Sequence, residues 1–186
     1  MFAVKSPLRI LGIDPGLSRC GYACIEVNRK APLKLVAIGV LTTPPSHALP
    51  NRLAELRAEL AALMDEVHPD VVAVEHVFFQ VNVRTAMSVG QASGLALAEA
   101  ASRGCEVVQY TPNEVKSTVA GWGAADKAQV GRMVQARLGL TEVPKPADAA
   151  DAAALALCYL ASAPMTKLTR VATDASAQRL ASGGRR

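Results

Sequence analysis

The sequence of 186 residues has few aromatic residues, few histidines and no long apolar run, and each scarcity excludes a class of protein. The longest nearly apolar stretch, residues 152–164, is too short to cross the roughly 30 Å hydrocarbon layer of a membrane. Pro7, Arg9 and Asp14 interrupt any apolar core of an N-terminal signal peptide. We therefore expect a cytoplasmic protein with no membrane partner.

Cysteine and histidine chemistry also finds little support. A chain with 51% apolar residues can build one packed core and has little need of disulfide bonds. Cys20 and Cys24 lack a second pair at zinc-ligand spacing, so we interpret the cysteines as reduced, small apolar residues. The three histidines, at positions 47, 68 and 76, lie in unrelated settings, which argues against a histidine-based mechanism.

Positive charge is concentrated at the C-terminal end. Residues 165–186 carry five of the 20 basic residues and one of the 16 acidic residues, so residues 1–164 hold 15 of each sign. The five are Lys167, Arg170, Arg179, Arg185 and Arg186. We expect one folded domain over residues 1–164 and a basic, disordered tail over residues 165–186.

Apolar periodicity predicts five strands and five helices. The strands are expected at 8–14, 20–28, 33–42, 70–75 and 105–110. Helices are expected between Pro50 and Pro69 and over 82–103, 113–119, 125–138 and 147–162, with a linker over 44–50. The first three strands suggest an antiparallel meander, and the fourth can return beside the first through a right-handed crossover. The pattern predicts an α/β fold with a five-stranded mixed sheet flanked by helices.

Two carboxylates lie where predicted strands end. Asp14 closes the first strand, and Glu75 closes the strand that follows the first helix. If these strands are parallel neighbours, both side chains emerge at the carboxyl edge of the sheet, where open α/β sheets place their chemistry. A turn aspartate before Pro15 is the alternative for Asp14, whereas an acid at the end of a buried apolar strand is costly unless it is paired.

A second acidic pair opens the last predicted helix. Asp148 and Asp151 are three residues apart, so their side chains share one face of the first turn. Such acids often serve only to cap a helix, but the rest of this helix is apolar, which predicts that it is buried against the sheet. Four carboxylates without nitrogen or sulfur ligands favour a hard cation such as Mg²⁺ or Mn²⁺.

Four segments, in order and at family-like separations, resemble the RuvC family of Holliday-junction resolvases. They are ILGIDPGLSRCGYA (10–23), VAVEHVFFQVNVRTAMSVGQASGLAL (72–97), YTPNEVKSTVAGWGAADKAQV (110–130) and KPADAADAAALAL (145–157). The resemblance covers roughly residues 8–162 and implies a ribonuclease-H-like fold. It also implies an endonuclease that cuts four-way DNA junctions at paired symmetric positions during recombination and DNA repair.

The resemblance further implies the catalytic residues, the cofactors and the partners. The catalytic acids and metal ligands fall on Asp14, Glu75, Asp148 and Asp151, with two metal ions in each active site. Two such ions can activate water and stabilise the leaving oxygen of an in-line displacement. The implied partners are four-way junction DNA, a second copy of the chain in a homodimer, and the RuvA–RuvB branch-migration complex.

Contacts to DNA and to the second copy are also expected from the resemblance. It places Phe78 on unpaired junction bases and Lys116 and Lys127 on phosphates near the cut, with core packing and solvated lysines as the alternatives. Trp122 either faces DNA or anchors its loop. The helix over 82–103 is the expected dimer interface, because it has apolar residues beyond those that one sheet face can cover. These are Met87, Val89, Ala92, Leu95 and Ala96.

One position departs from the family pattern, and two other functions compete with the nuclease. His76 stands where glutamine is expected, and it should point to the opposite face of the strand from Glu75.

An actin-like or Hsp70-like phosphotransferase would also use the G-I-D-P-G turn, but it needs a second glycine-rich loop and about twice the length. A catalytically silent DNA-binding module of the same fold would have no need of a complete acidic quartet.

Overall fold

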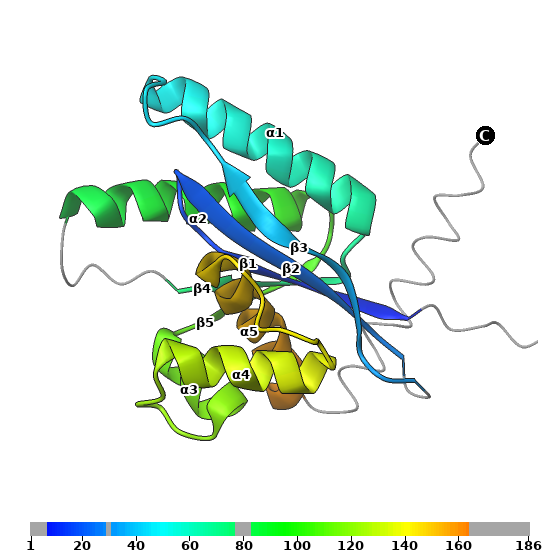
Figure 1. Cartoon of the computed structure of the whole chain (residues 1–186). Helices are drawn as coiled ribbons and strands as arrows, with labels where there is room; N and C mark the ends of the chain where they lie inside the picture. Colours follow the sequence, from blue (N-terminus) through cyan, green and yellow to red (C-terminus); the bar gives the residue numbers. More distant parts are fainter. Residues whose placement is uncertain (1–6, 29–30, 77–82, 164–186) are drawn as a thin grey trace, which may run out of the picture.

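The computed structural model describes residues 7–28, 31–76 and 83–163, and it confirms the predicted order of strands and helices (Figure 1). The strands are β1 (Leu8–Asp14), β2 (Arg19–Val27), β3 (Lys34–Thr42), β4 (Val71–Glu75) and β5 (Glu106–Tyr110). The helices are α1 (Leu49–Val67), α2 (Val83–Ser102), α3 (Pro112–Ala120), α4 (Lys127–Leu138) and α5 (Ala147–Ser162). The expected tail, residues 165–186, lies outside the described residues.

The five strands form one mixed sheet in the order β3-β2-β1-β4-β5. β1, β2 and β3 pair antiparallel, as the predicted meander requires, while β4 pairs parallel with both β1 and β5. The register of β1 and β4 sets Ile13 opposite Val74. Because the strands run in parallel, the next residues, Asp14 and Glu75, end the two strands side by side.

Helices cover both faces of the sheet (Figure 1). On one face, α1 and α2 pack over the side chains of Leu11, Ile13 and Val72. On the other face, α5 lies directly on the strands with α3 and α4 outside it, over Ile10 and Ala73. α5 is buried along almost its whole length, as its apolar sequence predicts.

Two helices, α1 and α4, start about two residues away from their predicted positions, and the other starts agree to within one residue. α1 begins at Leu49, inside the predicted linker, because Pro50 fits the first turn of a helix, where its missing N–H has no intrahelical acceptor. α4 begins at Lys127 rather than at residue 125. Asp126 stays outside the helix as its cap and accepts a hydrogen bond of 2.7 Å from the Gln129 N–H.

The burial of α2 changes its expected interface. Ala92 and Ala96 are fully buried against the sheet, so they pack within the chain. Met87 is 58% exposed and remains on the outer surface. The apolar surface that α2 offers to another molecule is therefore smaller than predicted.

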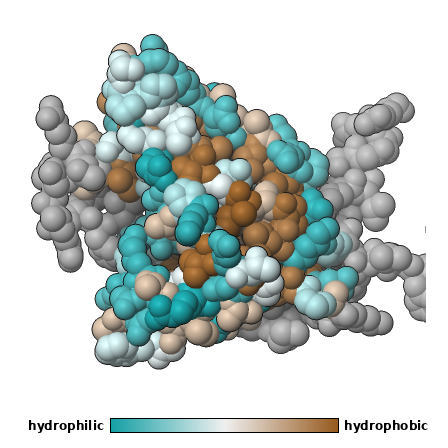
Figure 2. All heavy atoms as spheres, viewed as in Figure 1, coloured by the Kyte–Doolittle hydropathy of each residue, from teal (hydrophilic) through white to brown (hydrophobic). Residues whose placement is uncertain are grey.

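The edge of the sheet at β3 is only partly covered. Figure 2 shows apolar residues gathered over the sheet on the face in view, and the seven central residues of β3 are half-buried.

Among the described residues, no helix is both long and apolar enough to cross a membrane. All four cysteines are free, and Cys20, Cys24 and Cys158 are buried, as the composition predicted.

Candidate active site

The alternation of the strands sets the direction of Asp14 and Glu75. Ile10 on β1 and Ala73 on β4 belong to the core on the α5 face, and side chains two residues apart point to the same face. A Cβ added to Gly12 would collide with the carbonyl oxygen of Ala152 on α5, which confirms that Gly12, like Ile10, faces α5. Asp14 and Glu75 therefore end their strands on the face that α5 covers.

The first turn of α5 brings the second acidic pair to the same edge. A Cβ on Gly21 of β2 would lie 2.1 Å from the carbonyl oxygen of Asp148, so backbone meets backbone here. This close approach is possible only because Gly21 has no side chain. The same turn carries Asp151 three residues further on, so all four predicted acids converge on one end of the β1 and β4 strands.

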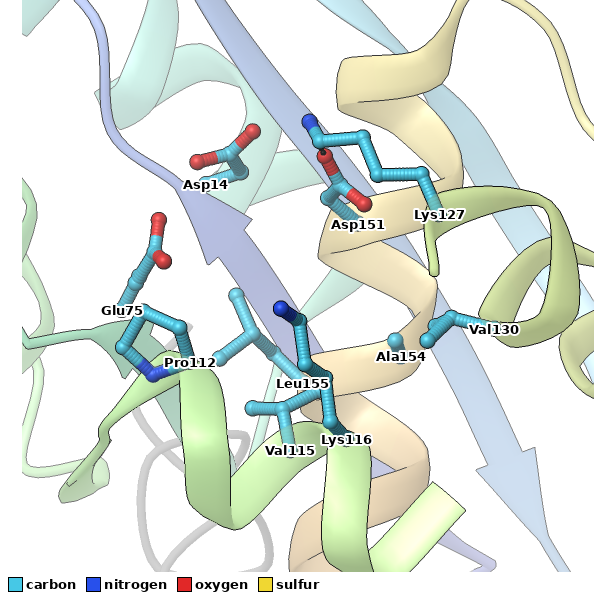
Figure 3. A pocket seen from close by; sticks show the side chains of 10 residues that line it. All are labelled: Asp14, Glu75, Pro112, Val115, Lys116, Lys127, Val130, Asp151, Ala154 and Leu155. Atoms are coloured by element: carbon cyan, nitrogen blue, oxygen red, sulfur yellow. Dashed lines mark hydrogen bonds and ion pairs between the residues drawn. The ribbon is translucent and has the colours of Figure 1, made fainter. Parts of the chain in front are cut away.

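A pocket of about 160 Å³ opens between these elements (Figure 3). The carboxylates of Asp14, Glu75 and Asp151 enter it from β1, β4 and α5, and the amino groups of Lys116 and Lys127 enter it from α3 and α4. Asp148 is not among the residues that line it. Five of the six predicted catalytic and phosphate-contacting residues that the structure describes thus share one cavity.

Burial and negative neighbours hold a proton on Asp14. Its pKa is raised from 3.8 to about 8, first because burial penalises the charged carboxylate and then because Glu75 repels a second negative charge and hydrogen-bonds to it. Asp151 and Asp148 add to the increase. Burial and the acidic neighbours therefore outweigh the attraction between Lys127 and a negatively charged Asp14.

Each acid of α5 has a basic partner. Arg19 Nε donates a hydrogen bond of 2.7 Å to Asp148 Oδ2, and Lys127 Nζ donates one of 2.8 Å to Asp151 Oδ2. The second bond raises the pKa of the Lys127 ammonium group. Among the ion pairs of the described residues, none involves Asp14 or Glu75.

The donor set of the pocket fits a hard divalent cation. Three carboxylates supply only oxygen ligands, and a cation there would offset the burial and the repulsion that keep Asp14 protonated. The ligand set is not assembled, because within the described ranges no three acidic, histidine or cysteine side chains already surround one ion position. Asp148 and Asp151 would have to turn from Arg19 and Lys127 before all four acids could bind metal together.

The remaining predicted residues lie around the pocket or outside the described part of the chain. Phe78 belongs to the undescribed residues 77–82, so its expected role has no structural counterpart. Trp122 is 63% exposed, which argues against its anchoring the loop between α3 and α4. His76 is exposed, and hydrogen bonds from Thr111, with a smaller Coulombic contribution from His76, lower the pKa of Glu114 on α3.

Arg19 is the residue of this site that the sequence reasoning missed. It opens β2 two residues before Gly21, so it points to the same face of the sheet as Gly21. Its strand pairs antiparallel with β1, which places it near the end of that strand where Asp14 lies. The sequence does show a basic residue that faces the same side of β2 as Gly21. Its role could not be inferred without knowing that α5 begins against Gly21.

Comparison with known proteins gives consistent matches. A family model described as "Crossover junction endodeoxyribonuclease RuvC" matches residues 10–159, a range that includes all four acids. The crossover junction endodeoxyribonuclease RuvC of Parafrankia sp. (strain EAN1pec) is 48% identical over 179 residues, which cover 96% of this chain and 100% of the relative.

Solved structures agree with the sequence match. The Thermus thermophilus RuvC structure is similar with a TM-score of 0.78 at 34% identity, covering 86% of this chain and 98% of that one. T. thermophilus RuvC in complex with Holliday junction substrate gives a TM-score of 0.80, also at 34% identity, with 86% and 97% of the two chains covered.

Proposed function

The chain belongs to the RuvC family of crossover junction endodeoxyribonucleases, and on this premise we propose that it is a Holliday-junction resolvase. It has the ribonuclease-H-like fold of the family, whose nucleases are metal-dependent. Its substrate is the four-way DNA junction, and its reaction is hydrolysis of phosphodiester bonds at paired symmetric positions. The reaction serves homologous recombination and DNA repair.

One observation carries this function within the structure. Asp14 and Glu75 end neighbouring parallel strands on the face that is covered by α5, and the first turn of α5 carries Asp148 and Asp151. We assign these four acids as the catalytic metal ligands. If Asp14 were only a turn residue, and if Asp148 and Asp151 only capped α5, there would be no reason for the four acids to meet at one edge of the sheet.

We assign two divalent cations, Mg²⁺ or Mn²⁺, to each active site. When bound, they supply activation of the attacking water and stabilisation of the leaving oxygen. Asp14 and Glu75 contribute carboxylates from backbone that strand pairing fixes, whereas the carboxylates of Asp148 and Asp151 must first leave Arg19 and Lys127. Lys116 and Lys127 line the same pocket, where their ammonium groups can hold the phosphate that is to be cut.

A twofold-symmetric substrate that is cut twice is best served by a symmetric homodimer. The outer face of α2 is our candidate interface, because Met87 on it is 58% exposed. We assign the stacking on unpaired junction bases to Phe78, which follows Glu75 by three positions. The RuvA–RuvB branch-migration complex is the proposed protein partner, and the cytoplasm, where a bacterial chromosome lies, is the proposed location.

The direct test is incubation of the protein with a synthetic mobile four-way junction in Mg²⁺ or Mn²⁺. We expect paired symmetric nicks that depend on the metal. Asp148→Asn and Asp151→Asn should remove cleavage, since each loses a negative ligand, while gel-shift assays should show that junction binding is retained. The matched control is Asp126→Asn, an acid-to-amide change beside Lys127 in which asparagine can still cap α4.

Two results would contradict this function. Full cleavage by both α5 variants would mean that Asp148 and Asp151 are not required as metal ligands. Junction binding by the unaltered chain without cleavage in either metal would favour a silent DNA-binding module.

A further inference from the structure

We propose that Arg19 is a positioning residue of the metal site, which holds the Asp148 carboxylate outside the pocket and so lowers the affinity of the site for divalent cations. A cation that binds must take this carboxylate from the Arg19 guanidinium. This inference rests on the proposed metal-dependent function. It concerns a residue outside the acidic quartet and outside the pocket lining.

The backbone around Asp148 leaves only its side chain free to move. Gly21 packs so closely against the first turn of α5 that an added Cβ would approach the Asp148 carbonyl oxygen to 2.1 Å. The position of the Asp148 backbone is therefore set by β2. Whether its carboxylate lines the pocket depends on side-chain rotation, and the 2.7 Å bond from Arg19 Nε holds it in a position where it does not.

The backbone at Arg19 is held just as firmly. The turn before it is tight, because a Cβ on Gly16 would lie 2.2 Å from the Arg19 carbonyl oxygen. Ser18, its neighbour, accepts a hydrogen bond of 2.6 Å from Arg52 on α1 through its hydroxyl oxygen. The Ser18 carbonyl oxygen also accepts a bond of 3.4 Å from the Thr43 N–H. The guanidinium thus extends from a fixed base.

The ion pair is suited to being exchanged. The side chains of Arg19 and Asp148 are 52% and 31% exposed, and ion pairs with this much solvent contact are weak. Such a pair can bias the direction of a carboxylate without blocking a divalent cation that several carboxylates bind together. Within the described residues, Asp148 is the side-chain partner that Arg19 has, so no second bond would hold the guanidinium in place.

Lys127 does not duplicate this role. It lines the pocket together with Lys116, so after releasing Asp151 its ammonium group still lies where a phosphate would bind. Arg19 approaches the quartet from β2 and is not among the residues that line the pocket. Its removal should therefore affect metal binding before any DNA is present.

The test titrates Mn²⁺ alone into the full chain, without DNA, and measures the dissociation constant by calorimetry. Arg19→Ala should bind Mn²⁺ about 2- to 5-fold more tightly, since a weak competing ion pair has been removed. Arg19→Lys keeps the charge and should move the affinity back toward that of the unaltered chain. Arg19→Gln, which is neutral and similar in size, replaces alanine if the alanine variant does not fold.

A matched control removes another exposed arginine with an acidic partner. Arg57 pairs with Glu99 at 3.5 Å between α1 and α2, so Arg57→Ala makes the same change in net charge away from the pocket. Its Mn²⁺ affinity should be unchanged. The rise in unfolding temperature caused by Mn²⁺ should likewise be larger for Arg19→Ala than for Arg57→Ala.

The outcomes separate this inference from the function on which it rests. If the unaltered chain binds Mn²⁺ and Arg19→Ala binds it equally or more weakly, Arg19 is a structural residue and the inference is overturned. If Arg57→Ala tightens binding as much as Arg19→Ala, only net charge matters, which also overturns it. If the unaltered chain binds no Mn²⁺ at all, the proposed metal site itself fails, and the role of Arg19 fails with it.

Discussion

Asp14 connects the protonation of one side chain to the state of the whole pocket. Its position at the end of β1 is fixed by strand pairing, so its backbone cannot move away from Glu75 when Asp14 loses its proton. Burial and this neighbour raise its pKa from 3.8 to about 8. A proton and a divalent cation are therefore alternative ways to reduce the same repulsion.

This shift predicts how the metal-free protein responds to pH. Between pH 4 and pH 8, the folded chain keeps a proton on Asp14 that the unfolded chain releases, so the stability contributed by this group falls as pH rises. The slope is at most about 1.4 kcal/mol for each pH unit. Urea unfolding with a chelator at pH 5, 6, 7 and 8 should show that the unaltered chain loses stability relative to Asp14→Asn.

The same series contains its own control. Asparagine cannot titrate, so the difference between the two proteins should shrink when Mg²⁺ is added at pH 8, because the ion replaces the proton in the unaltered chain. If the difference in free energy of unfolding between the two proteins stays constant across this pH range, the Asp14 pKa is not raised in the folded state.

At the scale of secondary-structure elements, the site depends on how closely α5 approaches the sheet. Gly12 on β1 and Gly21 on β2 both meet α5 backbone, at Ala152 and Asp148. These two glycines set the height of the helix above the strands. They therefore also set where the acidic first turn of α5 lies relative to Asp14.

Gly21→Ala should consequently damage stability and the site together. The added methyl group would be 2.1 Å from a backbone oxygen, so α5 must move, at a cost of about 1–3 kcal/mol or more. Chemical unfolding and Mn²⁺ titration measure the two effects. In Gly39→Ala, the matched strand glycine, the methyl group meets the hydroxyl and ring of Tyr22 rather than the backbone of α5, so Mn²⁺ affinity should not change and the loss of stability should be smaller. Equal effects of the two substitutions would contradict the importance of this α5 contact.

Much of this arrangement was predictable, because it follows from strand alternation and helix periodicity. The sequence predicted each strand to within about one residue, and the burial of α5 followed from its apolar composition. The convergence of Asp14 and Glu75 needed only the additional assumption that β1 and β4 are parallel neighbours, which the structure confirms.

The ion pairs were not predictable, for a physical reason. The Arg19–Asp148 pair joins residues 129 positions apart, and its geometry depends on the close packing of α5 at Gly21. Periodicity reports which face a side chain occupies, but not which rotamer a half-exposed carboxylate adopts. The start of α1 was wrong for a related reason, since proline is compatible with both a linker and a first helical turn.

At the scale of the whole molecule, the proposed dimer can be tested through α2. Met87 is 58% exposed on this helix, and a charge at the centre of an apolar interface is strongly unfavourable. Met87→Asp should shift the molecule toward monomer in sedimentation at micromolar concentration, with little change in folding. Met133→Asp is the control, because Met133 is 37% exposed on α4, away from α2. Monomer in the unaltered chain, with and without junction DNA, would contradict the proposed dimer.

The proposed division into a nuclease domain over residues 1–164 and a basic tail over residues 165–186 predicts a change in salt dependence. The tail accounts for the whole net charge of +4, so the domain alone has no net attraction for DNA beyond its local clusters. Deleting residues 165–186 should leave the unfolding midpoint and cleavage at saturating protein unchanged. It should weaken junction binding at low salt, and it should reduce the slope of log K against log salt by up to about 0.9 for each phosphate that the tail neutralises.

A tail of equal length with its five basic residues changed to glutamine controls for chain length. If the slope stays the same in both variants, the tail neutralises no phosphates, and the affinity for junction DNA must come from local clusters such as Lys116 and Lys127.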